Sequence, residues 1–112
     1  RAGWRLALVA RRDATVREWL AAQGIEGAGV YAADVRDIAA ITAAGRACIA
    51  AQGLPDAVIA NAGVSIGMDT AVAADLEVLR ETLETNLLGV AATFHPFVDG
   101  MRARRSGTLA GI

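Results

Sequence analysis

The stretch Asp56 to Gly63, DAVIANAG, decides the fold of this chain. Asp56 to Ala60 is a short, mostly apolar run that predicts a strand buried on both faces. Asn61-Ala62-Gly63 then predicts a tight turn in which Gly63 supplies a positive φ, and the small residues allow a flat ligand to approach the backbone closely. A buried strand followed by such a turn is typical of a parallel sheet with a ligand site at its carboxyl edge.

Similar apolar runs lie on both sides of this stretch. They cover residues 5–10 (RLALVA), 29–33 (GVYAA) and, at the start of a fourth strand, 108–112 (TLAGI). Helical patterns lie between them, and Asp13 and Asp37 are expected to cap the first two helices. From about Asp75, leucines at positions 76, 79, 83 and 87 form one apolar stripe on a long helix or a closely joined pair, which Pro96 is expected to kink or interrupt. Strands and helices that alternate in this way predict an α/β fold with a doubly wound parallel sheet.

The composition sets limits on function. The chain has 112 residues, enough for one domain or part of one and too few for a second. A formal charge of -1 and the lack of a basic run give no basis for binding nucleic acid or an anionic membrane. No apolar run has the length of a transmembrane helix. The single cysteine and single histidine cannot supply a zinc tetrad, and although this count does not exclude a site built from carboxylates, we predict no metal site. A lone cysteine is in keeping with a reducing cytoplasm, and every basic residue is an arginine.

Polar residues follow each predicted strand, where an open parallel sheet binds its ligand. Arg11 and Arg12 are either solvated surface residues or a guanidinium fork for phosphate oxygens. Asp34, which precedes Val35, either caps a turn or accepts a hydrogen bond from an exocyclic amine such as that of adenine. Asn61 either serves only the turn or lines the same ligand site at the carboxyl ends of the strands.

Asn86 is the most informative single residue. On a helical wheel it lies about 20° from Leu79, within the apolar stripe, so we expect its amide to be buried. A buried amide without partners costs about 1–3 kcal/mol, so it must be hydrogen-bonded. It is either a structural amide that bonds backbone at a helix kink or a polar anchor that holds a water or a catalytic group.

Taken together, these residues resemble the short-chain dehydrogenase/reductase family from Arg1 to Ile112. The matching elements, in chain order, are LALVARR, the strand that ends in Asp34-Val35, Asn61-Ala62-Gly63, the segment 85–89 (TNLLG) and the segment 106–109 (SGTL). The resemblance implies a Rossmann-like NAD(P)-binding domain that holds the second to fifth strands of the family fold. Its order, 3-2-1-4-5-6-7, would place a further strand between residues 5–10 and 56–60.

The resemblance also implies roles for the residues at the strand ends. Asp34 and Val35 would contact adenine, and Asn61, Ala62 and Gly63 would support the sheet beside the cofactor. Arg11, with Arg12 as a second candidate, fits the pattern that accompanies preference for NADP(H), while NAD(H) stays possible. Asn86 matches the asparagine of the family's catalytic tetrad, which favours the functional reading of that residue.

The departures from the family pattern are as informative as the matches. The glycine-rich loop and the serine, tyrosine and lysine of the tetrad are missing from these 112 residues. We therefore expect a fragment, inactive and unstable by itself, of an NADP(H)-dependent oxidoreductase that transfers hydride between nicotinamide and an alcohol or carbonyl substrate. The alternatives are a non-catalytic dinucleotide-binding or regulatory protein and, less in keeping with Asn86, an epimerase or dehydratase. The resemblance further implies a homo-oligomer, a dimer or tetramer, that associates through the helix over residues 86–105.

Overall fold

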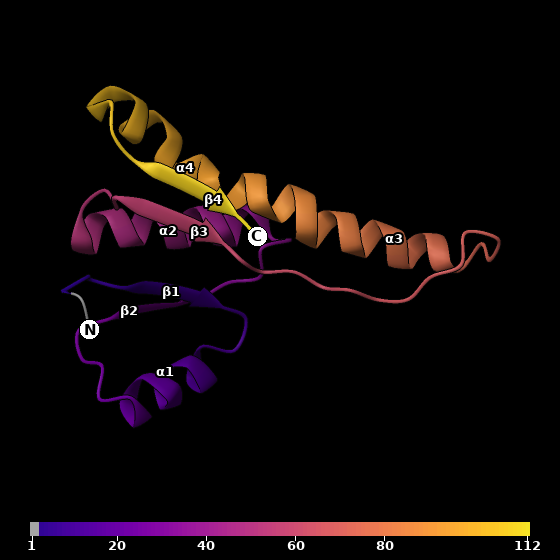
Figure 1. The fold of residues 1–112 in the computed structure, drawn as a ribbon, viewed down its shortest axis with the longest axis horizontal. Coiled ribbons are helices and arrows are strands. Elements are labelled where there is room, and N and C mark those ends of the chain that lie inside the picture. Colours follow the sequence, from indigo (N-terminus) through magenta and orange to yellow (C-terminus); the bar gives the residue numbers. More distant parts are fainter. Residues whose placement is uncertain (1–2) are drawn as a thin grey trace.

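The computed structural model describes residues 3–112 and shows strands alternating with helices (Figure 1). The elements in chain order are β1 (Ala7–Ala10), α1 (Asp13–Ala22), β2 (Gly29–Ala32), α2 (Ile38–Gln52), β3 (Ala57–Ala60), α3 (Asp75–Leu83), the π-helical turn η1 (Glu84–Leu88), α4 (Gly89–Arg104) and β4 (Thr108–Gly111). The four predicted strands are all present, and the predicted α/β class with a partial Rossmann-like sheet is confirmed.

The strands form two separate parallel pairs. β1 pairs with β2, with Ala7 opposite Gly29, and β3 pairs with β4, with Ala57 opposite Thr108. Within residues 3–112 no strand joins β1 to β3, so the sheet is divided between the second and third strands along the chain.

The facing edges of β1 and β3 are therefore open. The carbonyl oxygens of Leu6 and Ala10 accept hydrogen bonds from the β2 side, at 2.9 and 3.2 Å. Because successive residues of a strand direct their backbone groups to opposite sides, the backbone groups of Ala7 and Val9 point away from β2. The same alternation on β3 leaves every second residue pointing away from β4. These two edges have the geometry to pair with one further strand.

Helices cover both faces of the β1–β2 pair. Figure 1 shows α1 on one face and α2 on the other, with α4 beside α2. The main core cluster lies between β2, α2 and α4 and consists of Ala33, Ile41, Ala44 and Ala92. The helices α2 and α4 come close together at Gly45, where a Cβ atom would lie only 2.7 Å from Cγ of Pro96.

The helix starts show why only one of the two predicted caps forms. Asp37 caps α2, since its carboxylate accepts a hydrogen bond from the backbone N–H of Ala40 at 3.0 Å. The prediction for Asp13 is wrong, because Asp13 is already the first helical residue and Arg12 stands at the N-cap position. The Asp13 carboxylate forms an ion pair with Arg17 one turn along the helix instead, at 3.3 Å.

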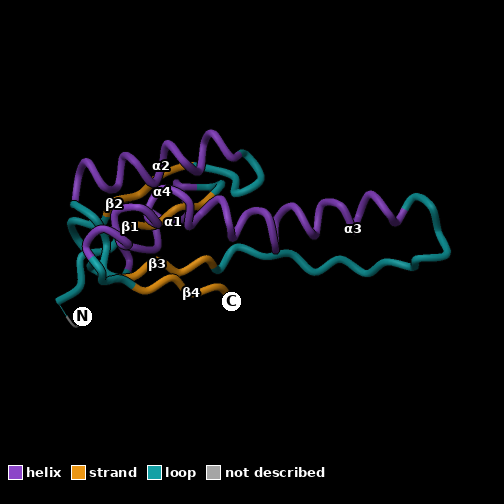
Figure 2. The backbone as a smooth tube through the Cα atoms, turned by 90° about the horizontal axis from the view of Figure 1, so that it is seen from above, coloured by secondary structure: helices purple, strands orange, loops and turns teal. Residues whose placement is uncertain are grey.

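The helices α3 and α4 follow each other without a break through η1. Of the two expectations for Pro96, the interruption is wrong, because Pro96 lies inside α4 and packs its ring against Gly45. The helix does bend along α4, as Figure 1 shows, in keeping with the expected kink. Figure 2 shows α3 extending away from the rest of the molecule with the loop after β3 running beside it. This projection accounts for the elongated dimensions of 50 × 37 × 24 Å.

Candidate functional site

An open groove of about 1430 Å³ extends along the gap between β1 and β3 to the carboxyl ends of the strands. All the predicted cofactor-binding residues line it: Arg11, Arg12, Asp34, Val35, Asn61, Ala62 and Gly63. They come from three separate strand ends, and the parallel direction of the strands places them at one edge. The predicted turn at residues 61–63 is wrong, because no turn is formed there and Gly63 does not have a positive φ. Asn86 does not line the groove, although its neighbour Thr85 and the nearby Gly89 do.

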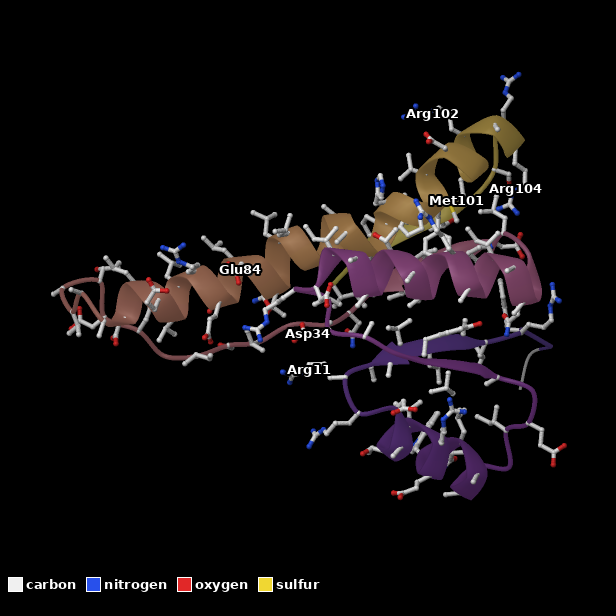
Figure 3. The ribbon with its side chains drawn as sticks, turned by 180° about the vertical axis from the view of Figure 1, so that it is seen from behind. Arg11, Asp34, Glu84, Met101, Arg102 and Arg104 are labelled. Carbon is white, nitrogen blue, oxygen red and sulfur yellow. The ribbon has the colours of Figure 1, made fainter. Side chains whose placement is uncertain are left out.

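Arg11 and Arg12 follow β1 directly and are both exposed. Neither guanidinium forms a hydrogen bond or an ion pair with another side chain in the described part of the chain. Figure 3 shows Arg11 beside Asp34, and its positive charge contributes to lowering the pKa of that carboxyl group. Two unpaired guanidinium groups at a strand end are suited to an anionic ligand such as a phosphate.

Asp34 is held by its own turn. The backbone N–H of Arg36 donates to Oδ1 of Asp34 at 2.9 Å, and the Arg36 guanidinium donates to Oδ2 at 3.4 Å. The backbone hydrogen bond from Arg36 is the main cause that holds the pKa of Asp34 below its ordinary value of 3.8, and partial burial opposes it. Asp34 is therefore an ionised hydrogen-bond acceptor at neutral pH, and 32% of its side chain is exposed at the groove.

Val35 connects this turn to the long helix. A Cβ atom at Gly89 would lie 2.8 Å from Cγ2 of Val35, so the Val35 side chain occupies the space that glycine leaves free. Gly89 is buried at the junction of η1 and α4. The close approach of Val35 to the helix therefore depends on a glycine at position 89.

Asn86 holds the loop that follows β3. Its Oδ1 accepts from the backbone N–H of Val64 at 2.8 Å, and its Nδ2 donates to the backbone carbonyl of Val64 at 2.7 Å. The expected burial of Asn86 is wrong, because the residue is exposed, as are Leu83 and Leu87 on the same helix. The helical wheel assumes a regular α-helix, whereas Asn86 lies within the π-helical turn η1. In addition, no described element covers the leucine stripe on this side of the helix. The amide bonds backbone at a helix irregularity, which was the first of the two alternatives for this residue.

The turn η1 gives this part of the helix its unusual geometry. The N–H of Gly89 donates to the carbonyl of Glu84, an i→i+5 bond in place of the α-helical i→i+4 bond. Single π-helical turns within α-helices occur frequently at functional sites. Here the turn places Asn86 opposite Val64, next to the end of β3.

Two residues of this region were not singled out from the sequence. Arg36 lies two positions after Asp34, the spacing at which an aspartate commonly accepts a hydrogen bond from backbone, and this signal was available. Val64 contributes only backbone groups to Asn86, so its side chain gave no signal. Among residues 3–112, no three His, Cys, Asp or Glu side chains gather into a group that could hold a metal ion.

None of the helices within residues 3–112 has the length and apolar character needed to cross a membrane.

Solved structures with this fold are numerous. An alcohol dehydrogenase from the archaeon Thermococcus sibiricus, complexed with 5-hydroxy-NADP, shares 28% sequence identity and a TM-score of 0.81 over 96% of this chain and 47% of its own. Serine dehydrogenase from Escherichia coli shares 27% identity and a TM-score of 0.81 over 94% of this chain and 48% of its own. A short-chain dehydrogenase from Streptomyces avermitilis shares 26% identity and a TM-score of 0.84 over 98% of this chain and 40% of its own. The chain thus spans less than half the length of each of these structures.

The family comparison covers the complete sequence. No match was found among curated proteins. The family model for short chain dehydrogenases matches residues 1–112. Together with the divided parallel sheet and the rim of strand ends, this match establishes that the chain belongs to the short chain dehydrogenase family.

Proposed function

We propose that these residues form the adenine- and phosphate-binding half of an NADP(H)-dependent oxidoreductase, which transfers hydride between nicotinamide and an alcohol or carbonyl substrate. One observation supports this most directly: two unpaired cations, an ionised carboxylate and the small-residue segment 61–63 line one groove at the carboxyl ends of parallel strands. The complex of a related alcohol dehydrogenase with 5-hydroxy-NADP is in keeping with this choice of cofactor.

The chemistry of the residues fits such a cofactor. Arg11 and Arg12 would hold the additional phosphate that distinguishes NADP(H) from NAD(H), because guanidinium groups form paired hydrogen bonds with phosphate oxygens. Asp34 would accept a hydrogen bond from the exocyclic amine of adenine, and the backbone at Val35 would contact the same base. Asn61, Ala62 and Gly63 would leave room for the cofactor beside the sheet. The nicotinamide would supply the redox chemistry, and the residues named here would anchor the adenine end of the same cofactor.

We assign Asn86 a supporting part in catalysis. Both polar atoms of its amide are engaged by Val64, so the side chain acts by fixing the loop after β3 and the helical turn to each other. This connection would help to organise a proton relay whose tyrosine and lysine come from outside these residues, since the 112 residues contain no lysine.

The proposal extends to assembly and location. Leu76, Leu83 and Leu87 on the α3–η1 rod are about half exposed or more, as expected of a helix that pairs with a second copy in a dimer or tetramer. Cys48 is a free, buried thiol, which is compatible with a reducing cytoplasm. The partner would be a small-molecule alcohol or carbonyl compound.

The test is a titration of the full-length protein with NADPH and NADH. Arg11→Ala should weaken NADPH binding about tenfold or more and leave NADH binding nearly unchanged, because the lost hydrogen bonds are charge-assisted and reach only the additional phosphate. Arg46→Ala is the matched control, since Arg46 is an exposed arginine on α2 that does not line the groove. If Arg11→Ala and Arg12→Ala both keep the wild-type preference for NADPH, the phosphate assignment is wrong. NADPH binding without turnover of any alcohol or carbonyl compound would favour the non-catalytic binding protein.

A further inference from the structure

Arg36 contacts Asp34 through two different groups. Its backbone N–H binds one carboxylate oxygen at 2.9 Å, and its guanidinium binds the other at 3.4 Å. A further backbone hydrogen bond, from Asp37 N–H to the carbonyl of Asp34 at 3.0 Å, closes the same turn. Arg36 therefore engages both carboxylate oxygens and restrains the orientation of the carboxylate before any ligand binds.

The restrained carboxylate keeps free acceptor capacity. An ionised carboxylate has about four lone-pair sites, and Arg36 uses one on each oxygen. Asp34 lines the groove and is partly exposed there, so its remaining sites are accessible to a ligand. Arg36 leaves the acceptor in place and limits the directions from which a ligand can approach it.

A carboxylate that is held in one orientation and can only accept hydrogen bonds distinguishes bases by whether they present a donor or an acceptor to it. A base with an exocyclic amine presents a donor to the carboxylate and gains a hydrogen bond. A base with an oxo group at that position presents an acceptor instead. The oxo oxygen and the carboxylate oxygen then repel each other, and no hydrogen bond forms. If the carboxylate were free to rotate, it would turn away from the oxo group, and part of this discrimination would be lost.

We propose that Arg36 is a positioning residue that sets base selectivity, making this site prefer an amino-purine dinucleotide over an oxo-purine one through the fixed orientation of Asp34. This inference rests on the proposed function, since it assumes that Asp34 faces the base. Arg36 also lines the groove, where its guanidinium is hydrogen-bonded to Asp34. Its effect is exerted through the two hydrogen bonds to Asp34.

The experiment compares the binding of NADPH with that of its hypoxanthine analogue, in which an oxo group replaces the exocyclic amine. Dissociation constants of both are measured for the full-length wild-type protein and for Arg36→Ala, Arg36→Lys and Asp34→Ala. The wild-type protein should bind NADPH about tenfold more tightly than the analogue. Arg36→Ala should reduce this ratio to about threefold or less, and Arg36→Lys, which keeps a cation near Asp34, should restore part of it.

Arg80→Ala is the matched control. Arg80 forms an exposed ion pair with a nearby carboxylate, Glu77, at 3.3 Å on α3 and does not line the groove, so its removal should leave the ratio unchanged.

The outcomes separate this inference from the proposal on which it rests. If Asp34→Ala abolishes the ratio and Arg36→Ala leaves it at the wild-type value, Asp34 reads the base and Arg36 does not position it, so the inference is wrong. If Arg36→Ala weakens both ligands equally, its role is structural only, and the inference is again wrong. If Asp34→Ala keeps the wild-type ratio, the assignment of Asp34 to the base fails, and with it the proposed site.

Discussion

At the scale of single residues, the charge state of Asp34 leads to a test on stability. Its folded pKa lies below 3.8, so the ionised form is the one that the folded state favours. The resulting stabilisation is fully present above 3.8 and is lost as the pH falls through the lower folded value.

We therefore expect full-length wild-type protein to exceed Asp34→Asn in stability by a constant amount, about 0.5–1 kcal/mol, from about pH 5 to pH 8. The difference should shrink only below about pH 4. Urea denaturation at a series of pH values measures it. A difference that shrinks between pH 6 and pH 7 would contradict an ionised, restrained Asp34.

The sequence was a good guide to which residues meet and a poor guide to how they are held. Arg11, Asp34 and Gly63 each follow an apolar run, and parallel strands bring such positions to one edge, so their common groove was predictable. The contacts of Asn86 depend on a π-helical turn, which periodicity at 3.6 residues per turn cannot reveal. The double contact from Arg36 depends on the conformation of one turn rather than on the type of side chain alone.

At the scale of elements, the junction of η1 and α4 depends on Gly89. Gly89→Ala would place a Cβ atom 2.8 Å from Cγ2 and 3.0 Å from Cβ of Val35. Valine is stiff about χ1, so it cannot move aside without displacing its own backbone. We expect the full-length Gly89→Ala protein to lose about 1–3 kcal/mol of stability, measured by chemical denaturation.

A second substitution makes this test specific. Val35→Ala should restore part of the loss in the Gly89→Ala background, because it removes Cγ2, the atom that would lie nearest, and leaves Cβ at 3.0 Å. Gly67→Ala serves as the control, since nothing lies within 4 Å of a Cβ atom there. Equal costs for Gly89→Ala and Gly67→Ala would show that the contact with Val35 is unimportant.

The element boundaries show what local signals determine. Asp37 was correctly predicted as a cap, because a carboxylate before an apolar helix satisfies a free N–H group. Asp13 precedes a similar pattern, yet the helix begins at that residue and Arg17 takes up its carboxylate. Pro96 is tolerated inside α4 because its ring fits against Gly45 of another helix. That contact lies far along the chain and leaves no trace in the local sequence.

At the scale of the whole molecule, the divided sheet predicts that these 112 residues are unstable by themselves. Val9 and Ile59 are 41% and 62% exposed, although they lie in strands whose composition suits a buried sheet. Exposed apolar strands with open edges are sites of association between chains. We expect the 112-residue chain to show no cooperative thermal transition and to elute larger than a monomer.

Circular dichroism melting and size-exclusion chromatography with light scattering provide the measurement. The full-length protein, treated in the same way, should melt cooperatively. A monomeric 112-residue chain with a sharp thermal transition would show that the two strand pairs are stable without a strand between them.

The division of the sheet also bears on the order in which the chain folds. The segment between β1 and β2 covers residues 11–28, whereas the one between β3 and β4 covers residues 61–107. Closing the shorter loop costs less chain entropy, and contacts of low sequence separation form faster. The β1–α1–β2 unit is therefore expected to assemble first, while the ribosome is still adding the later half. The slow step would then be the docking of the two preformed strand pairs onto the strand that joins them.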